Sequence, residues 1–233
     1  MNPNNPNDPN VQQVQLVVNA LGALADRVVL VGGCATGLLI TDTTRPPVRA
    51  TQDVDLVAEV ATKTEYYALA DELRTLGFQE NPGEVICRWR YGALAIDIMS
   101  CSDDVLGFSN RWYADAVKAA EPVTLPEGRA IRLITAPYFI ATKIEAFYDR
   151  GNGDFVESRD IEDIINVVDG RPSLSAEIAA TNDPVREYLK DEIDDLIATE
   201  AFVDSLPGHL RPNTLDQQRV GEVLGQLRRI AGL

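Results

Sequence analysis

Histidine, cysteine and lysine are scarce in this chain, which contains one histidine, three cysteines and four lysines. The cysteines stand far apart at positions 34, 87 and 101, without the paired spacing of a zinc site or a disulfide framework. A hydrolase that pairs a nucleophile with histidine would depend on His209 alone, which lies in a proline-containing turn with no nucleophile motif nearby. Carboxylates, arginines and a few lysines are therefore the side chains available for chemistry.

Basic residues are in deficit as well. The chain has 21 Lys plus Arg against 36 Asp plus Glu, a formal net charge of -15. Broad DNA binding is not expected, because it needs basic side chains over much of the surface to neutralise phosphates. The composition does not exclude a local basic pocket. No apolar run approaches the length of a membrane span, and the N-terminus is not basic and then apolar, so we expect a cytoplasmic protein without membrane association.

Hydrophobic residues make up 45% of the 233-residue chain, which is enough to form a core. Residues 1–10, rich in Asn and Pro, predict a disordered tail. Residues 11–128 alternate between helical and strand patterns and predict an α/β domain, whereas residues 129–233 predict a helical domain that completes a cleft. We therefore predict an α+β fold with an N-terminal mixed β-sheet flanked by helices, followed by a C-terminal helical bundle.

The periodicity of apolar residues predicts the individual elements. Helices are expected over 11–25, 34–40, 63–77, 137–150, 158–170, 173–180, 183–206 and 215–231, and strands over 28–31, 48–60, 84–92 and 93–100. The last two strands are joined by a tight turn at Gly92.

The segment before Leu56 carries the first candidate site. In the strand expected there, Arg49, Thr51, Asp53 and Asp55 are two residues apart and form one row. Two carboxylates at neighbouring positions of one face repel each other unless a cation lies between them. Oxygen ligands of this kind suit a hard divalent ion, with Mg²⁺ favoured.

Asp97 is a third carboxylate, placed among apolar residues of a later strand. It could lie on the solvated face of an edge strand, or it could join Asp53 and Asp55 in holding two Mg²⁺ ions for phosphoryl or nucleotidyl transfer. The pair Gly32-Gly33 stands at a strand-to-helix junction, where phosphate can approach the backbone, although any tight turn would also select glycine.

Lys143 lies in an otherwise apolar helix and should meet an anion, either a nucleotide phosphate or the carboxylate of Asp160 or Asp163. Asp160 and Asp163 share one helix face, and one of them could simply favour the N-terminus of that helix. Residues 177–204 hold nine acidic and two basic side chains, which suit a solvated face or the docking of a basic partner.

Taken together, Gly32-Gly33 before a helix, R-x-T-x-D-x-D at 49–55 and the later Asp97 resemble the nucleotidyltransferase superfamily, which has the DNA polymerase β-like fold. Within it, the chain looks like the AbiEii/AbiGii toxin-type family, because residues 143–164 are similar to its K-x-x-A-x-x-x-R and R-D-x-x-D motifs. The resemblance covers about residues 28–170. Where the superfamily often has Ser after the first Gly, this chain has Gly33.

This resemblance implies a Mg²⁺-dependent enzyme that transfers NMP from NTP to an acceptor hydroxyl, with tRNA or protein as acceptor. It further implies a toxin of a toxin–antitoxin or phage-defence system, with a possible cognate antitoxin. The alternatives are a transferase acting on an aminoglycoside-like small molecule, and a catalytically silent nucleotide- or cation-binding protein. The implied catalytic residues are Asp53, Asp55, Asp97, Lys143 and Asp160; the first three would bind two Mg²⁺ ions, and Gly32, Gly33, Arg49, Thr51, Lys143 and Asp163 would bind nucleotide.

Overall fold

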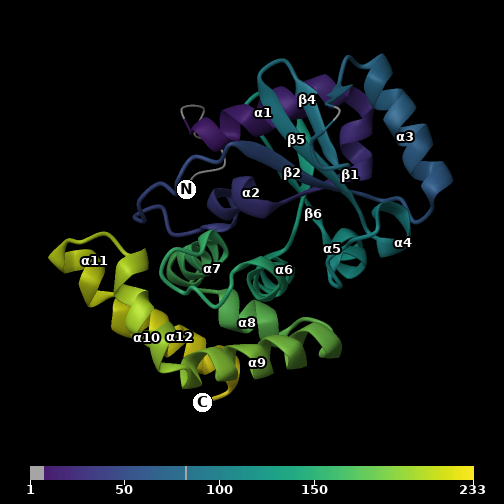
Figure 1. The fold of residues 1–233 in the computed structure, drawn as a ribbon. Helices are drawn as coiled ribbons and strands as arrows, with labels where there is room; N and C mark the ends of the chain where they lie inside the picture. The colour runs from purple at the N-terminus through teal and green to yellow at the C-terminus, as the bar shows by residue number, and fades with distance from the viewer. Residues whose placement is uncertain (1–7, 82) are drawn as a thin grey trace. The chain divides into compact units, whose positions relative to one another are not determined.

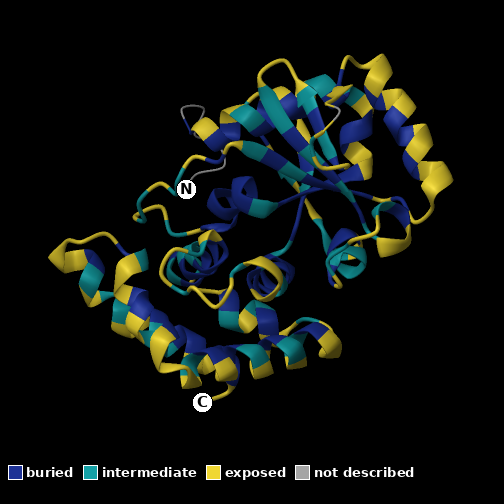
Figure 2. Cartoon of the chain, viewed as in Figure 1, coloured by how far each residue is buried: buried dark blue, intermediate teal, exposed yellow. Residues whose placement is uncertain are grey.

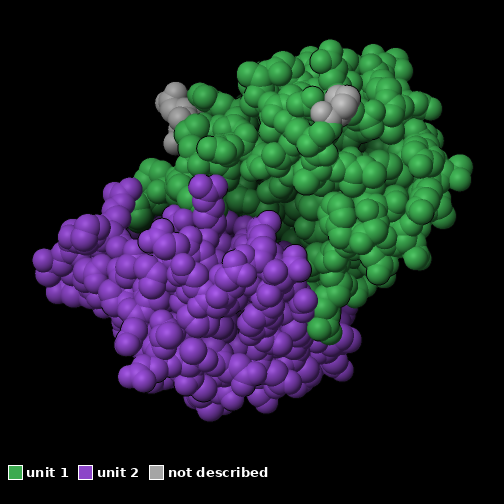
Figure 3. All heavy atoms as spheres, in the orientation of Figure 1, with its two compact units in different colours: residues 1–38, 46–135 green, residues 39–45, 136–233 purple. Residues whose placement is uncertain are grey.

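The computed structural model describes residues 8–81 and 83–233 (Figure 1). They divide into two compact units, shown in different colours in Figure 3. Of the described residues, unit 1 contains 8–38, 46–81 and 83–135, and unit 2 contains 39–45 and 136–233. None of the helices within the described residues is both long and apolar enough to span a membrane.

Unit 1 is built on a mixed sheet of seven strands, counted over the described residues. The order across the sheet is β3 (Gln79–Glu80), β4 (Arg88–Tyr91), β5 (Leu94–Ser100), β2 (Asp53–Ala58), β1 (Val28–Val31), β7 (Ala130–Leu133) and β6 (Glu121–Thr124). The pairs β2–β5 and β1–β7 are parallel, and the other neighbours are antiparallel. The predicted α+β class is confirmed.

The helices of unit 1 are α1 (Pro9–Leu21), α2 (Gly32–Leu39, whose last residue falls in unit 2), α3 (Lys63–Thr75), α4 (Asp103–Leu106) and α5 (Tyr113–Ala119). A 3-10 helix, Gly22–Arg27, connects α1 to β1. Alternate residues of β2 and β5, such as Leu56 and Ile98, are apolar and fully buried, so they form an apolar face of the sheet. Figure 2 shows the burial along the chain. Helix α3 is tied to this sheet by Tyr66, whose hydroxyl donates to the carbonyl of Ile98.

The N-terminal segment differs from the expected tail. Residues 8–10 are ordered, because the carboxylate of buried Asp8 accepts hydrogen bonds from the amides of Asn10 (2.9 Å) and Val11 (3.4 Å) and so caps α1. The prediction of disorder is wrong for these residues. Asn and Asp are common both at helix N-caps and in disordered tails, so composition alone does not distinguish the two. Residues 1–7 lie outside the described residues.

Two boundaries in unit 1 also need correction. The strand expected from residue 48 begins only at Asp53, so Arg49 and Thr51 lie in an irregular segment and not in the row of the strand. The expected helical part, 129–233, begins with a strand, because Ala130–Leu133 pairs with β1 as β7. Four residues carry too little periodicity to reveal such a strand.

Unit 2 is helical, as predicted. Its helices are α6 (Ala136–Arg150), α7 (Arg159–Gly170), α8 (Leu174–Ala179), α9 (Asp183–Ala198), α10 (Glu200–Ser205), α11 (Thr214–Gln218) and α12 (Val220–Ala231), with a 3-10 helix at Leu206–His209. The helix expected over 183–206 is broken at Thr199, which has an extended backbone. The earlier segment 39–45 is anchored here, because the amides of Thr41 and Asp42 donate to the carbonyl of Gly170 at 3.0 and 2.9 Å.

Candidate functional site

Three aspartates of unit 1 converge on one face of the sheet. Asp53 and Asp55 alternate on β2, and the parallel register of β2 and β5 places Asp97 directly beside Asp55. One carboxylate oxygen from each residue lies within 4.8 Å of the other two. We call these residues the aspartate triad. The alternative of a solvated edge strand is wrong for Asp97, since β5 pairs with strands on both sides.

The glycine pair makes room for the triad and its neighbour. Gly32 has φ +62°, and a Cβ atom there would overlap with Oδ2 of Asp55. A Cβ atom on Gly33 would lie 2.6 Å from Cγ2 of Thr51. The side chains of Asp55 and Thr51 thus leave no room for a Cβ atom at either glycine. The contact of the two glycines with phosphate stays a prediction.

Arg88, which was not among the predicted catalytic, nucleotide-binding or metal-binding residues, contacts the triad. The guanidinium of Arg88 donates from Nε and Nη2 to the two oxygens of Asp97, at 2.7 and 2.6 Å, and from Nη2 to Oδ2 of Asp53 at 3.0 Å. Asp97 and Asp53 together raise the pKa of Arg88, and the largest cause is the hydrogen bonding that Arg88 donates to Asp97. The hairpin centred on Gly92 could have revealed this contact, because it pairs Arg88 with Asp97.

The segment that leads into β2 is held by side chains of α1. The side-chain amide of Asn10 donates to the carbonyl of Arg49 (2.9 Å) and accepts from the backbone amide of Thr51 (2.9 Å). Gln13 donates to the carbonyl of Thr51 at 3.1 Å. These bonds replace a neighbouring strand as partner for this backbone. They explain why the sheet begins at Asp53 and not earlier.

The hydroxyl of Thr51 is turned inward in this segment. Its Oγ1 lies 2.9 Å from Sγ of buried Cys34 and donates to the carbonyl of Asp53 at 3.2 Å. Burial is the main reason that the pKa of Cys34 rises to about 12, with the charges of Asp55 and Asp53 adding to it. Thr51 therefore positions the entry to β2, and Cys34 is an inert thiol.

Unit 2 contains the second set of predicted residues, and they form a buried ion-pair network. Nζ of Lys143 donates to Asp160 at 3.0 Å and to Asp163 at 2.7 Å, and all three side chains are at most 8% exposed. Arg150 adds two hydrogen bonds to Asp160, at 2.9 and 2.8 Å. The salt bridge that the sequence left open is present; a role in nucleotide binding stays a prediction.

The network also shifts the pKa values of Asp160 and Lys143. Burial alone would raise the pKa of Asp160, but the hydrogen bonds from Arg150 and the charge of Lys143 lower it. Burial alone would lower the pKa of Lys143, but Asp163 and Asp160 raise it. Asp160 and Lys143 are therefore both charged at neutral pH, and each stabilises the charge of the other.

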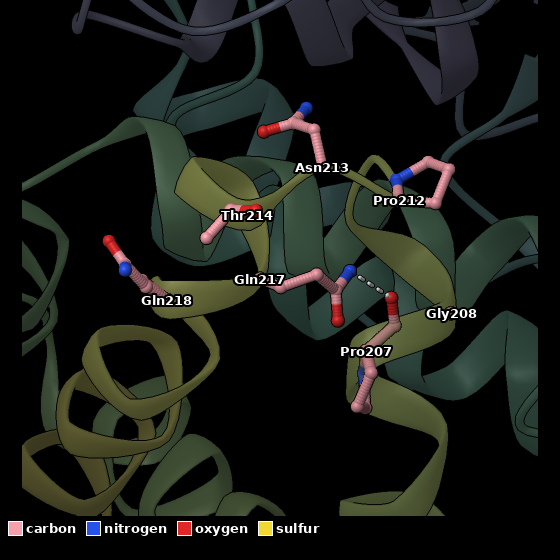
Figure 4. A pocket seen from close by; sticks show the side chains of 7 residues that line it. All are labelled: Pro207, Gly208, Pro212, Asn213, Thr214, Gln217 and Gln218. Carbon is pink, nitrogen blue, oxygen red and sulfur yellow. Dashed lines mark hydrogen bonds between the residues drawn. The ribbon is translucent and has the colours of Figure 1, made fainter.

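A shallow hollow of about 840 Å³ lies in unit 2 beside α11 (Figure 4). It is lined by Pro207, Gly208, Pro212, Asn213, Thr214, Gln217 and Gln218. Nε2 of Gln217 donates to the carbonyl of Pro207 at 3.0 Å. None of the lining side chains is charged, so the hollow offers no counter-charge to a polyphosphate, and no predicted site residue lines it.

Comparisons with known proteins find no matching family model and no curated protein of similar sequence. Among solved structures, an antigenic nucleotidyltransferase-like protein from Paracoccidioides brasiliensis is similar, with a TM-score of 0.56 and 22% identity over 86% of this chain and 92% of that chain. The antibiotic-resistance factor ANT(2'')-Ia has a TM-score of 0.48 and 16% identity over 81% of this chain and 95% of its own. The first of these likenesses shows that the chain has a nucleotidyltransferase-like fold.

Proposed function

We propose that this chain is a divalent-cation-dependent nucleotidyltransferase that transfers NMP from an NTP to an acceptor hydroxyl. The observation that carries the proposal is the aspartate triad, whose oxygens lie within 4.8 Å of one another on the sheet of a nucleotidyltransferase-like fold. Three carboxylates brought this close repel one another, so the arrangement needs positive charge, which Arg88 supplies to Asp53 and Asp97 and which a divalent cation would supply to all three.

The donor set fits a hard cation, with Mg²⁺ favoured, because it consists of carboxylate oxygens on partly exposed side chains that a ligand can reach. Asp53, Asp55 and Asp97 would hold it, and the two-ion arrangement predicted from the sequence belongs to this proposal. A bound divalent cation supplies charge neutralisation for the triphosphate and for the pentacoordinate transition state.

The chain's own groups would complete the reaction. The acceptor oxygen attacks the α-phosphorus, the bond from that phosphorus to the bridging oxygen breaks, and pyrophosphate leaves. Asp97 would take the proton of the acceptor hydroxyl. The backbone at Gly32 and Gly33 opens α2, and amides at a helix N-terminus favour phosphate oxygens.

The acceptor is proposed from the sequence motifs. Their similarity to the AbiEii/AbiGii toxin-type family supports tRNA or protein as acceptor and a toxin role with a cognate antitoxin. In this proposal, Lys143 and Asp160 also contact nucleotide or acceptor, in exchange for part of their ion-pair network. A cationic small molecule as acceptor is the other outcome that the net charge of -15 makes worth testing.

The test uses purified protein with Mg²⁺ and NTPs labelled at the α- or γ-phosphate. Total RNA, a protein extract and a panel of aminoglycosides are offered separately as acceptors. We expect α-label to appear on one acceptor class and γ-label in pyrophosphate, with loss of both in Asp53→Asn. The matched control Asp104→Asn removes an exposed carboxylate of the same unit and should keep full activity. No transfer to any acceptor with folded protein would contradict the proposal.

A further inference from the structure

Arg88 and a divalent cation would need the same oxygens. Both oxygens of Asp97 and Oδ2 of Asp53 accept hydrogen bonds from the Arg88 guanidinium. A carboxylate oxygen has few lone pairs with which to accept hydrogen bonds or bind a cation. The guanidinium of Arg88 faces both oxygens of Asp97 and occupies the lone pairs that point toward β4. Asp55 is the member of the triad that turns toward Gly32 at the start of α2.

The backbone of Arg88 is held in place by the sheet, whereas its guanidinium is held by the hydrogen bonds to Asp53 and Asp97. The residue pairs with Asp97 in the antiparallel register of β4 and β5, and the amide of Ile98 donates to the carbonyl of Cys87 at 2.8 Å beside it. The next residue, Trp89, is completely buried. The Arg88 side chain itself is 27% exposed, so the guanidinium can swing toward solvent without moving the strand.

We propose that Arg88 is an internal competitor of the divalent cation: its guanidinium must release Asp53 and Asp97 before a cation can bind the full triad, and it thereby sets the cation affinity. This inference rests on the proposed function. When a site is competent for only a fraction of the time, the apparent affinity falls by that fraction. Arg88 also balances the charge of Asp53 and Asp97 when no cation is bound, which stabilises the closely spaced carboxylates.

Arg90 offers a matched control for the charge itself. It lies two residues further along β4 and therefore on the same face, but its Nη2 forms an ion pair with Glu84 at 2.5 Å. Replacing either arginine by Gln removes one positive charge from the same strand. A purely long-range electrostatic effect would thus be similar in both variants, whereas direct competition is confined to Arg88.

The experiment measures Mn²⁺ binding by titration calorimetry at constant ionic strength, for the wild type, Arg88→Gln, Arg90→Gln and Asp53→Asn. We expect Arg88→Gln to bind Mn²⁺ about tenfold more tightly and Arg90→Gln to change the affinity by less than about threefold. Arg88→Lys keeps the charge but loses the fork, so its affinity should fall between the wild type and Arg88→Gln. This variant provides the test if Arg88→Gln does not fold.

Unfolding temperatures give a second readout. Without cation, Arg88→Gln should unfold at a lower temperature than the wild type, and saturating Mn²⁺ should raise its unfolding temperature by more. Equal or weaker Mn²⁺ binding in the folded Arg88 variants, with binding in the wild type that Asp53→Asn abolishes, overturns the competition alone. Absence of Mn²⁺ binding in every variant overturns both the competition and the proposed function.

Discussion

Replacing Lys143 by Met would leave two buried carboxylates of unit 2 without their shared cation. Asp163 is 2% exposed and lies 2.7 Å from Nζ of Lys143, and Asp160 is 5% exposed and lies 3.0 Å from it. Asp160 keeps Arg150 as a partner, and Asp163 loses its buried ion pair with Lys143. Met retains most of the aliphatic stem, so little cavity forms and the change is mainly electrostatic.

Breaking a buried ion pair by removing one partner costs about 3–5 kcal/mol, because the remaining charge is buried without compensation. We expect a loss of this size in the free energy of unfolding at pH 7. The control is Lys118→Met, which breaks the pair with Asp115, whose side chains are 74% and 49% exposed. An exposed pair of this kind is worth less than about 1 kcal/mol.

The loss should depend on pH in a defined direction. The pKa of Asp160 is lowered in the folded protein, so its contribution to stability is complete above its unfolded pKa of about 3.9 and declines as the pH falls further. The pKa of Lys143 is raised, so its contribution is complete below its unfolded pKa of about 10.4 and declines above it. The difference between wild type and Lys143→Met should therefore be largest between these values.

Urea denaturation followed by far-ultraviolet circular dichroism measures the loss, because the helices of unit 2 contribute strongly to that signal. Both tryptophans, Trp89 and Trp112, belong to unit 1, so their fluorescence reports the other unit in the same titration. A change below about 1 kcal/mol at pH 7, equal to that of Lys118→Met, would refute the claim that the buried carboxylates depend on Lys143.

Gly32→Ala should destabilise the protein by about 1–3 kcal/mol and weaken Mn²⁺ binding, because its Cβ overlaps with Asp55 at a positive φ; Gly92→Ala, at φ +59° with open space around it, should destabilise the protein without affecting binding. Cys34 should resist iodoacetamide at pH 8 until the protein unfolds, as peptide mass spectrometry can show, because its raised pKa of about 12 leaves about one thiolate in ten thousand. Asn10→Ala should cost about 1–3 kcal/mol in urea denaturation, since it leaves backbone groups of the segment before β2 unpaired; a cost near zero would show that water replaces them.

Local patterns were sufficient for most of unit 2 and for the hairpin at Gly92. The apolar spacing in α6 and α7 predicted both helices closely, since a helix repeats its buried face every turn. The alternation on β2 likewise placed Asp53 and Asp55 on one face. The proximity of Asp97 depends on the parallel pairing of β2 and β5, which no local pattern specifies. A carboxylate among apolar strand residues left a metal site shared with Asp53 and Asp55 as one of two alternatives, and the resemblance then favoured it.

Contacts that span long stretches of chain were not predictable in this way. Asn10 bonds to Thr51 across 41 residues, and Arg88 to Asp53 across 35 residues. In the first case, the Asn-rich composition of the N-terminus indicated disorder, because composition does not distinguish an amide that faces water from one that binds a backbone segment. In the second case, the hairpin at Gly92 indicates that Arg88 lies opposite Asp97, but the contact with Asp53 depends on the pairing of β5 with β2.

The anchoring of residues 39–45 on α7 affects folding during synthesis and recombination of the gene. During synthesis this segment emerges long before α7, whose Gly170 carbonyl its amides will later bind, so unit 2 cannot complete its packing until the ribosome has passed well beyond unit 1. A genetic exchange at residue 135 would separate Arg45 from Asp169, whose carboxylate lies 3.5 Å away. Recombination therefore cannot transfer unit 2 as one contiguous stretch of the gene, because residues 39–45 are encoded apart from residues 136–233.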